Sequence, residues 1–309
     1  MNTYLKYQPS GIHILAFLAF AGGCFLLSSI VSYFYFQDVY AIMLNKTATV
    51  SPEIITKFKL AQLFSAILSF LLPALLFGYY SSPKSLPYIG LQPHLSLSIM
   101  LAVLLLFIFI QPFIGYIGYF NSHLHFGSFQ KYIDQTEGRY ERALKIFLQM
   151  PSLSDFFINL FIMALLPAVC EELFFRGAFQ KVLIRISKRP WVGILVSAIV
   201  FALLHGTMLK IIPIFFLGML LGTVYYFTRN IWYTITIHFI NNGMALLAVY
   251  FGEKNELLKK ISDDNYMPPL YMAVAGLGIS ILMLNIIRKK SNEVFPKFMS
   301  DEDNDYIAR

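Results

Sequence analysis

Residues 157–177, FINLFIMALLPAVCEELFFRG, place two adjacent glutamates and an arginine inside a strongly apolar stretch. An ionisable side chain within a membrane-spanning helix costs at least ~2.5–3.5 kcal/mol on insertion scales, and it usually faces the interior of a helix bundle or water. The stretch therefore predicts a membrane-spanning helix, and its charged residues predict a functional site within that helix.

The whole chain has the composition of a membrane protein. Of its 309 residues, 57% are hydrophobic and 13% are charged, whereas roughly a quarter of the residues of a soluble domain are charged. Apolar stretches of about 20 residues, which are long enough to cross a hydrocarbon core of roughly 30 Å, recur along the sequence. We therefore predict an all-α fold, a polytopic bundle of transmembrane helices, and exclude an ordinary soluble protein.

Eight membrane spans are expected. They cover, in chain order, residues 11–36, 58–80, 95–120, 153–180, 191–208, 211–228, 230–250 and 268–287. The connections around Lys210 and Arg229 are very short, which makes the fifth, sixth and seventh spans antiparallel neighbours. Gly218 and Gly222, four residues apart in the sixth span, would allow another helix to approach closely.

The spans predict a single integral-membrane domain over residues 1–290, followed by a polar tail at 291–309. The tail is acidic and polar towards its end, so we expect it to be disordered. We expect the apolar run behind the first ten residues to be a retained span, because it lacks a clear cleavage site for a signal peptidase. The cysteines, Cys24 and Cys170, lie within apolar runs and predict no disulfide framework and no metal site.

A polar connection, residues 121–152, separates the third and fourth spans. Within it, apolar side chains recur at helical spacing: Ala143, Ile146, Phe147 and Met150. This pattern predicts an amphipathic helix, which would either lie in the membrane interface or pack on the end of the bundle.

The basic residues predict the orientation in the membrane, because Lys and Arg are enriched in short cytoplasmic loops. Two clusters follow the fourth and eighth spans: Lys181, Arg185, Lys188 and Arg189, and then Arg288, Lys289 and Lys290. An even number of spans separates them, so both clusters and both chain ends are expected in the cytoplasm. We predict a multi-pass protein of a prokaryotic plasma membrane. The net charge of +7 then reflects the cytoplasmic ends of the spans, and the expected partner is the lipid bilayer rather than nucleic acid.

Three charged residues of the fourth span form the first candidate cluster. Glu172 and Arg176 are four residues apart and therefore share one helix face, where they can form an ion pair. Glu171 is rotated by about 100° from Glu172. The arginine can thus neutralise one glutamate and leave Glu171 as a free carboxylate. The alternative is a purely structural ion pair at the inner end of the helix.

Two later spans contribute further polar groups. His205 lies in the fifth span, one turn after Phe201 on the same face. His238 lies in the seventh span, with Asn242 one turn later and Asn241 close by. Each of these groups needs a hydrogen-bond partner in an apolar span, so interhelical hydrogen bonding is the structural alternative to a catalytic role.

Neighbouring helices would combine these groups into one polar cavity. A carboxylate and an imidazole can activate water, while a second imidazole and an amide can donate hydrogen bonds to an oxyanion. Such a set suits the hydrolysis of an amide bond.

The order E-E-x-x-x-R, F-x-x-x-H and H-x-x-x-N on successive transmembrane helices resembles the CAAX prenyl protease and bacteriocin-processing family of intramembrane glutamate endopeptidases. The matching residues are Glu171, Glu172, Arg176, Phe201, His205, His238 and Asn242. The resemblance covers residues 153–250, the motif core, and implies that 1–290 is a protease domain.

The resemblance also implies roles for these residues. Glu171 and His205 would activate the attacking water, and His238 and Asn242 would form the oxyanion site. Glu172 and Arg176 would support the site. The substrate would be a membrane protein or a membrane-associated peptide, and no cofactor is expected.

Two alternatives stay open at this stage. Two glutamates and two histidines could bind Zn²⁺, although the sequence has no H-E-x-x-H motif and the resembled family is understood to be independent of metal. A membrane immunity factor or scaffold that cleaves nothing is the other alternative. Every motif position is filled, which favours an active protease.

Overall fold

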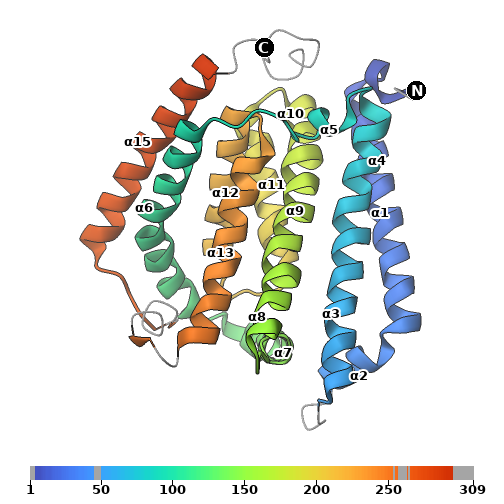
Figure 1. Cartoon of the computed structure of the whole chain (residues 1–309), viewed down its shortest axis with the longest axis vertical. Helices are drawn as coiled ribbons and strands as arrows, with labels where there is room; N and C mark the ends of the chain where they lie inside the picture. Colours follow the sequence, from blue (N-terminus) through green and yellow to red (C-terminus); the bar gives the residue numbers. More distant parts are fainter. Residues whose placement is uncertain (1–3, 45–49, 253–254, 257–262, 264, 295–309) are drawn as a thin grey trace.

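The computed structural model describes residues 4–44, 50–252, 255–256, 263 and 265–294. The described chain is a bundle of helices and contains no strand (Figure 1). The all-α prediction is confirmed. The helices are, in chain order, η1 (Tyr4–Tyr7), α1 (Ser10–Tyr35), α2 (Gln37–Leu44), α3 (Pro52–Ala66), η2 (Ile67–Leu71), α4 (Leu72–Ser81), α5 (Ser85–Tyr88), α6 (Leu97–Ser122), η3 (Gly127–Phe129), α7 (Gln130–Phe147), α8 (Leu153–Asn159), η4 (Leu160–Leu165), α9 (Leu166–Glu172), η5 (Leu173–Phe179), α10 (Gln180–Ser187), α11 (Pro190–Leu204), α12 (Ile211–Thr228), α13 (Ile231–Phe251) and α15 (Leu270–Val294).

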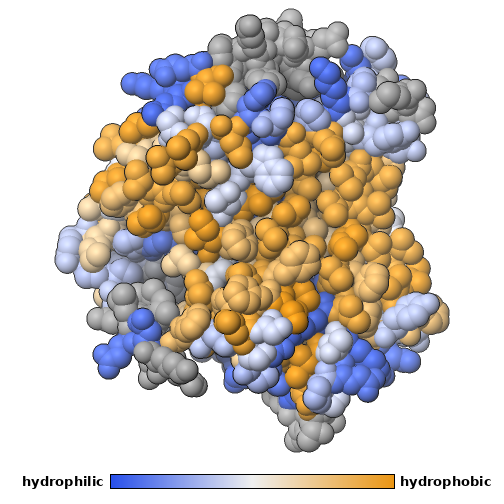
Figure 2. Space-filling model, in the orientation of Figure 1, coloured by the Kyte–Doolittle hydropathy of each residue, from blue (hydrophilic) through white to orange (hydrophobic). Residues whose placement is uncertain are grey.

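Seven helical stretches are long and apolar enough to cross a membrane. They are Ser10–Tyr35, Pro52–Ser81, Leu97–Ser122, Leu153–Ser187, Ile211–Thr228, Ile231–Phe251 and Leu270–Val294. On the face that Figure 2 shows, apolar residues form a broad band with hydrophilic residues towards both ends. The prediction of a polytopic membrane protein is therefore confirmed.

The predicted fifth span, 191–208, is shorter than expected. Helix α11 has 15 residues and is about 22 Å long, whereas the hydrocarbon core is roughly 30 Å thick. The helix stops because Gly206 adopts φ +70°, a left-handed conformation that favours glycine after a helix end. Helix α11 is therefore not among the seven helices of membrane-spanning length in the described chain, whereas the sequence predicted eight spans.

Helices α11 and α12 pack closely and antiparallel, as the sequence predicted. A Cβ atom at Gly218 would lie 3.1 Å from the Cβ of Ala198, and one at Gly222 would lie 3.0 Å from a methyl carbon of Ile194. The two glycines thus allow close approach of the helices, which confirms the predicted packing role of the pair.

The fourth span runs further than predicted. Its helix continues through α10 to Ser187, so Lys181 and Arg185 are helical rather than part of a loop. The helix continues because side chains of α10, Val182 and Ile184, are buried against the bundle. The connection to α11 is reduced to two residues.

The relative placement of the chain segments agrees with the predicted topology. The ends of α10 and α15 and the N-terminal segment lie at one end of the bundle, and α7 lies at the other (Figure 1). The two basic clusters thus share a side, opposite to the connection between the third and fourth spans. Which end faces the cytoplasm stays a prediction.

The structure shows how helix α7, in the polar connection, packs, and where helix α15, before the polar tail, ends. Helix α7 packs on the end of the bundle with Ile133 and Ile146 buried, and Phe147 meets the ring of Phe58 edge-on at 5.4 Å. Helix α15 extends to Val294, because Ser291 is still buried against the bundle. Beyond Val294, the predicted tail at 291–309 lies outside the described residues.

Candidate active site

The glutamate pair lies where the long fourth span departs from α-helical geometry. Glu171 and Glu172 are the last residues of α9, which lies between the π-helical segments η4 and η5. Pro167, at the start of α9, cannot donate a backbone hydrogen bond, and such a residue disturbs the helix before it. π-Helical turns are rare and often occur at functional sites.

Glu172 and Arg176 form the predicted ion pair. Both side chains are buried, and Arg176 Nη1 donates to Glu172 Oε1 at 2.6 Å. The guanidinium lies over the ring of Phe201, 4.5 Å from its centroid. A buried charge is tolerated only when it is paired and hydrogen-bonded, and both conditions hold for this arginine.

Arg176 also joins the fourth span to α12, together with Gln180. Arg176 Nη2 donates to the carbonyl oxygen of Gly218 at 3.2 Å, and Gln180 Nε2 donates to that of Gly222 at 3.0 Å. Arg176 and Gln180 are four residues apart, and so are Gly218 and Gly222. The two hydrogen bonds therefore join matching positions on the facing sides of the two helices. Gln180 was not among the predicted residues, although it follows Arg176 by four positions in the sequence.

His238 lies between the two glutamates. Its Nδ1 is 3.0 Å from Glu172 Oε1, and its Nε2 is 4.0 Å from Glu171 Oε2. Arg176 donates to the same oxygen of Glu172, which marks this group as an ionised carboxylate that can only accept. The hydrogen bond therefore assigns a proton to Nδ1 of His238 and directs Nε2 towards Glu171.

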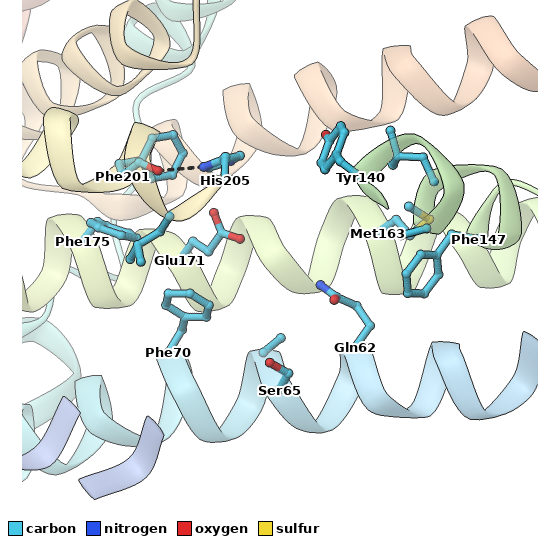
Figure 3. Close-up of a pocket in the computed structure, with 14 residues that line it drawn as sticks. Gln62, Ser65, Phe70, Tyr140, Phe147, Met163, Glu171, Phe175, Phe201 and His205 are labelled. Atoms are coloured by element: carbon cyan, nitrogen blue, oxygen red, sulfur yellow. Dashed lines mark hydrogen bonds between the residues drawn. The ribbon is translucent and has the colours of Figure 1, made fainter. Parts of the chain in front are cut away.

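His205 and Glu171 face a common cavity. The cavity has a volume of about 340 Å³ and lies between α3, α7, α9 and the end of α11. The carboxylate of Glu171 points towards His205 across it (Figure 3). His205 Nδ1 donates to the carbonyl oxygen of Phe201 at 2.7 Å, which leaves Nε2 as an acceptor.

Phe201 brings the motif residues together. Its ring is fully buried and lies 4.6 Å from the ring of His205 and 5.8 Å from that of His238. Because it also contacts the guanidinium of Arg176, one side chain touches a residue of each of the three motifs.

Asn242 lies further from the described contacts of the site. It follows His238 by one turn of α13 and is half-buried, and its Oδ1 accepts from Asn241 Nδ2 at 3.4 Å. The residues lining the cavity include Glu171 and His205, whereas His238 and Asn242 lie outside that lining. The structure thus brings five of the six predicted residues into direct contact or one cavity, and places Asn242 beside them.

The rest of the cavity wall was not predicted. Gln62 and Ser65 project from α3 towards α9, opposite Glu171 (Figure 3), and Tyr140 contributes from α7. Their signal in the sequence was weak: two polar residues three apart share a helix face, but α3 also carries Lys57 and Lys59, so polar residues there do not single out a site. The remaining wall is apolar and is formed by Ala66, Phe70, Ala143, Leu144, Phe147, Met163, Phe175, Phe201 and Leu204.

The arrangement of donors bears on the zinc alternative. Among the residues that the structure describes, no group of three or more His, Cys, Asp and Glu side chains is arranged to hold a metal ion. One oxygen of Glu172 is occupied by Arg176 and one nitrogen of His238 by Glu172, which reduces the ligands available to a metal.

Comparison with known proteins finds a family match within the segment that carries the motifs. Residues 153–244 match the family described as type II CAAX prenyl endopeptidase Rce1-like. The matched segment, about a third of the chain, is thus similar to the CAAX proteases. The chain matches no curated protein and no solved structure.

With seven helices in its described part that are long and apolar enough to cross a membrane, the protein is a multi-pass membrane protein, and the family match supports a relation to CAAX-type proteases. The matched segment contains α8 to α12 and most of α13, and thus all three motifs. The cavity walls supplied by α3 and α7 lie outside it.

Proposed function

We propose that this protein is a CAAX-type endopeptidase that hydrolyses a peptide bond of a membrane protein or membrane-associated peptide. The observation that carries the proposal is the pairing of Glu171 and His205 across one cavity, from helices that the sequence separates. A carboxylate and an imidazole acceptor that face the same cavity can bind a water molecule and remove its proton.

In the proposed mechanism, the water attacks the carbonyl carbon of the scissile bond while Glu171 takes its proton. His205 Nε2 accepts a hydrogen bond from the same water and orients it. The proton then passes to the leaving nitrogen, and the C–N bond breaks to give a carboxyl and an amine. Because the base is a carboxylate, this mechanism needs no cofactor.

We assign the oxyanion site to His238 and Asn242. Nδ1 of His238 is bonded to Glu172 at 3.0 Å, and its Nε2, 4.0 Å from Glu171, would be the nitrogen that donates to the oxyanion. The Asn242 amide would supply the second donor.

The shape of the cavity supports a peptide substrate with apolar side chains. A volume of about 340 Å³ suits a short extended segment rather than a folded domain. The phenyl and aliphatic side chains of the wall would bind apolar groups, while Gln62 and Ser65 can exchange hydrogen bonds with a peptide backbone.

The test is to reconstitute the full chain in lipid nanodiscs and to follow cleavage of quenched fluorescent peptides of varied apolar sequence. We expect cleavage by the wild type and a loss of at least about 10³-fold with Glu171→Gln, because the base is removed. Glu141→Gln is the control, since Glu141 is exposed on α7. In cells, membrane peptides that accumulate with Glu171→Gln and are absent with the wild type would identify natural substrates. Equal peptide profiles and equal cleavage would contradict the proposal.

A further inference from the structure

A buried carboxylate outside the motifs holds the loop that follows His205. Glu137, on α7, is 7% exposed. It accepts hydrogen bonds from the hydroxyl of Thr207 at 2.9 Å and from the backbone N–H groups of Met208 and Leu209 at 2.6 and 3.2 Å. Two successive N–H groups that converge on one anion form a backbone nest, and bonds to a charged acceptor are among the strongest in proteins.

A second buried side chain holds the other side of this loop. Asn121, at the end of α6, is fully buried. Its Nδ2 donates to the carbonyl oxygen of Met208 at 2.9 Å, and its Oδ1 accepts from the N–H of Ile212 at 2.8 Å. The loop between α11 and α12 is therefore fixed by polar contacts on both sides, both from the segment that joins the third and fourth spans.

The same helix that carries Glu137 also forms part of the cavity wall. Tyr140, Leu144 and Phe147 of α7 line the cavity, and Glu137 lies one turn before Tyr140. Helix α7 thus touches both the space where a substrate would bind and the loop that begins at His205. A movement of this helix would displace both together.

We propose that Glu137 is a positioning residue for His205, and that α7 is part of the active site rather than an outer connection. His205 is the last residue before Gly206, where the chain turns with φ +70°, so the direction of its ring depends on how the following residues are held. This inference rests on the proposed function, because it assigns His205 a role in water activation.

The test uses the full chain in nanodiscs with Glu137→Gln, a change that keeps the shape but replaces one acceptor oxygen by a donor. Glu141→Gln is the matched control, since it makes the same change one turn later on the exposed face of α7. Two quantities are measured for each: hydrogen exchange at the amides of residues 206–212, and kcat and KM for peptide cleavage.

With Glu137→Gln we expect faster exchange at Met208 and Leu209 and a fall in kcat of about 10- to 100-fold with KM within about threefold, since a misplaced catalytic group affects turnover rather than uniform binding. The control should match the wild type in both. Thr207→Val removes a single donor and serves as a milder variant if Glu137→Gln unfolds. It should change exchange and kcat in the same direction.

Two results would overturn the proposal. Faster exchange with an unchanged kcat would make Glu137 a structural anchor only, and unchanged exchange would show that it does not hold the loop. A wild type without peptidase activity would refute the proposed function and with it the positioning role, while the exchange measurement would still decide whether Glu137 fixes the loop.

Discussion

The two adjacent glutamates of the fourth span have opposite environments. Glu172 is fully buried and bonded to Arg176 and His238, whereas the side chain of Glu171 keeps 17% exposure at the cavity. Glu172 therefore stabilises the structure through its buried contacts, whereas the carboxylate of Glu171 faces the cavity, where a reaction could take place. A helix separates adjacent residues by about 100°, and that rotation suffices to divide the roles.

This division predicts different effects for the same substitution. Glu172→Gln removes the partner of a buried cation, and breaking a buried pair typically costs about 3–5 kcal/mol. Glu171→Gln leaves the Glu172–Arg176–His238 contacts in place, so its melting temperature should stay close to that of the wild type while activity is lost. Thermal unfolding in detergent measures both. A Glu171 variant that is the less stable of the two would reverse our assignment.

Asn242 gives a test of the oxyanion site. Removal of one oxyanion donor typically lowers turnover by about 10²–10³-fold, so we expect this loss with Asn242→Ala and a stability change of no more than ~1–2 kcal/mol. Asn241→Ala should retain most of the activity, because the contact of its amide within the described residues is with Asn242. Greater damage from Asn241→Ala would make both side chains structural.

We also predict that the catalytic residues need no cofactor. If Glu171 and His205 activate water directly, treatment with a chelator such as EDTA or phenanthroline should leave peptide cleavage within about twofold of its starting rate. Loss of activity on chelation, restored by added Zn²⁺ that binds in a 1:1 ratio, would instead establish a metalloprotease.

Helix packing around the site depends on small residues and on register. Arg176 and Gln180 reach the carbonyl oxygens of Gly218 and Gly222, and a Cβ atom at Gly222 would lie only 2.7 Å from Gln180 Oε1. The short helix α11 packs against the same face of α12. The ion pair of the fourth span and the position of His205 therefore depend on one close contact between helices.

Gly222→Ala tests this contact. The added methyl would lie 2.7 Å from Gln180 Oε1 and 3.0 Å from Ile194, and overpacking of this kind costs about 1–3 kcal/mol. Gly278→Ala in α15 is the control, since nothing lies within 4 Å of its added methyl. Unfolding in detergent should separate the two variants, and an equal stability would show that α11 and α12 tolerate a wider spacing.

The whole molecule places the cavity and the basic clusters towards different ends of the bundle. Helix α7, which closes part of the cavity wall, lies at the end opposite to the C-terminal ends of α10 and α15 (Figure 1). With the basic clusters in the cytoplasm, α7 and the loop after His205 would face the outer side of the membrane.

Labelling of single cysteines tests this orientation. Ser128→Cys, beside α7, should react with a membrane-impermeant maleimide in intact cells, and Lys289→Cys, near the end of α15, only after permeabilisation. Both positions are exposed. The native cysteines are buried, so the unmodified chain is the control. Reaction of both variants from the same side would refute the topology, and a reversed pattern would refute only its cytoplasmic assignment.

The sequence by itself determined whatever depends on residues close along the chain. Apolar runs predicted the membrane-spanning helices, and the i,i+4 spacing of Glu172 and Arg176 predicted their ion pair, because helix periodicity is local. The order of the motifs predicted the protease family. The boundaries of the fourth and fifth spans were wrong, since the packing of α10 and the left-handed Gly206 decided where those helices end.

Only the tertiary structure decided which distant groups meet. His238 bonds to Glu172 across 66 residues, and Glu137 bonds to Thr207 across 70. Neither pair has a periodic signal, because the contact depends on how whole helices pack and not on the spacing of side chains along one helix. A buried polar group without a hydrogen bond costs free energy in an apolar environment, so each such group needs a partner. The tertiary fold decides which group that partner is.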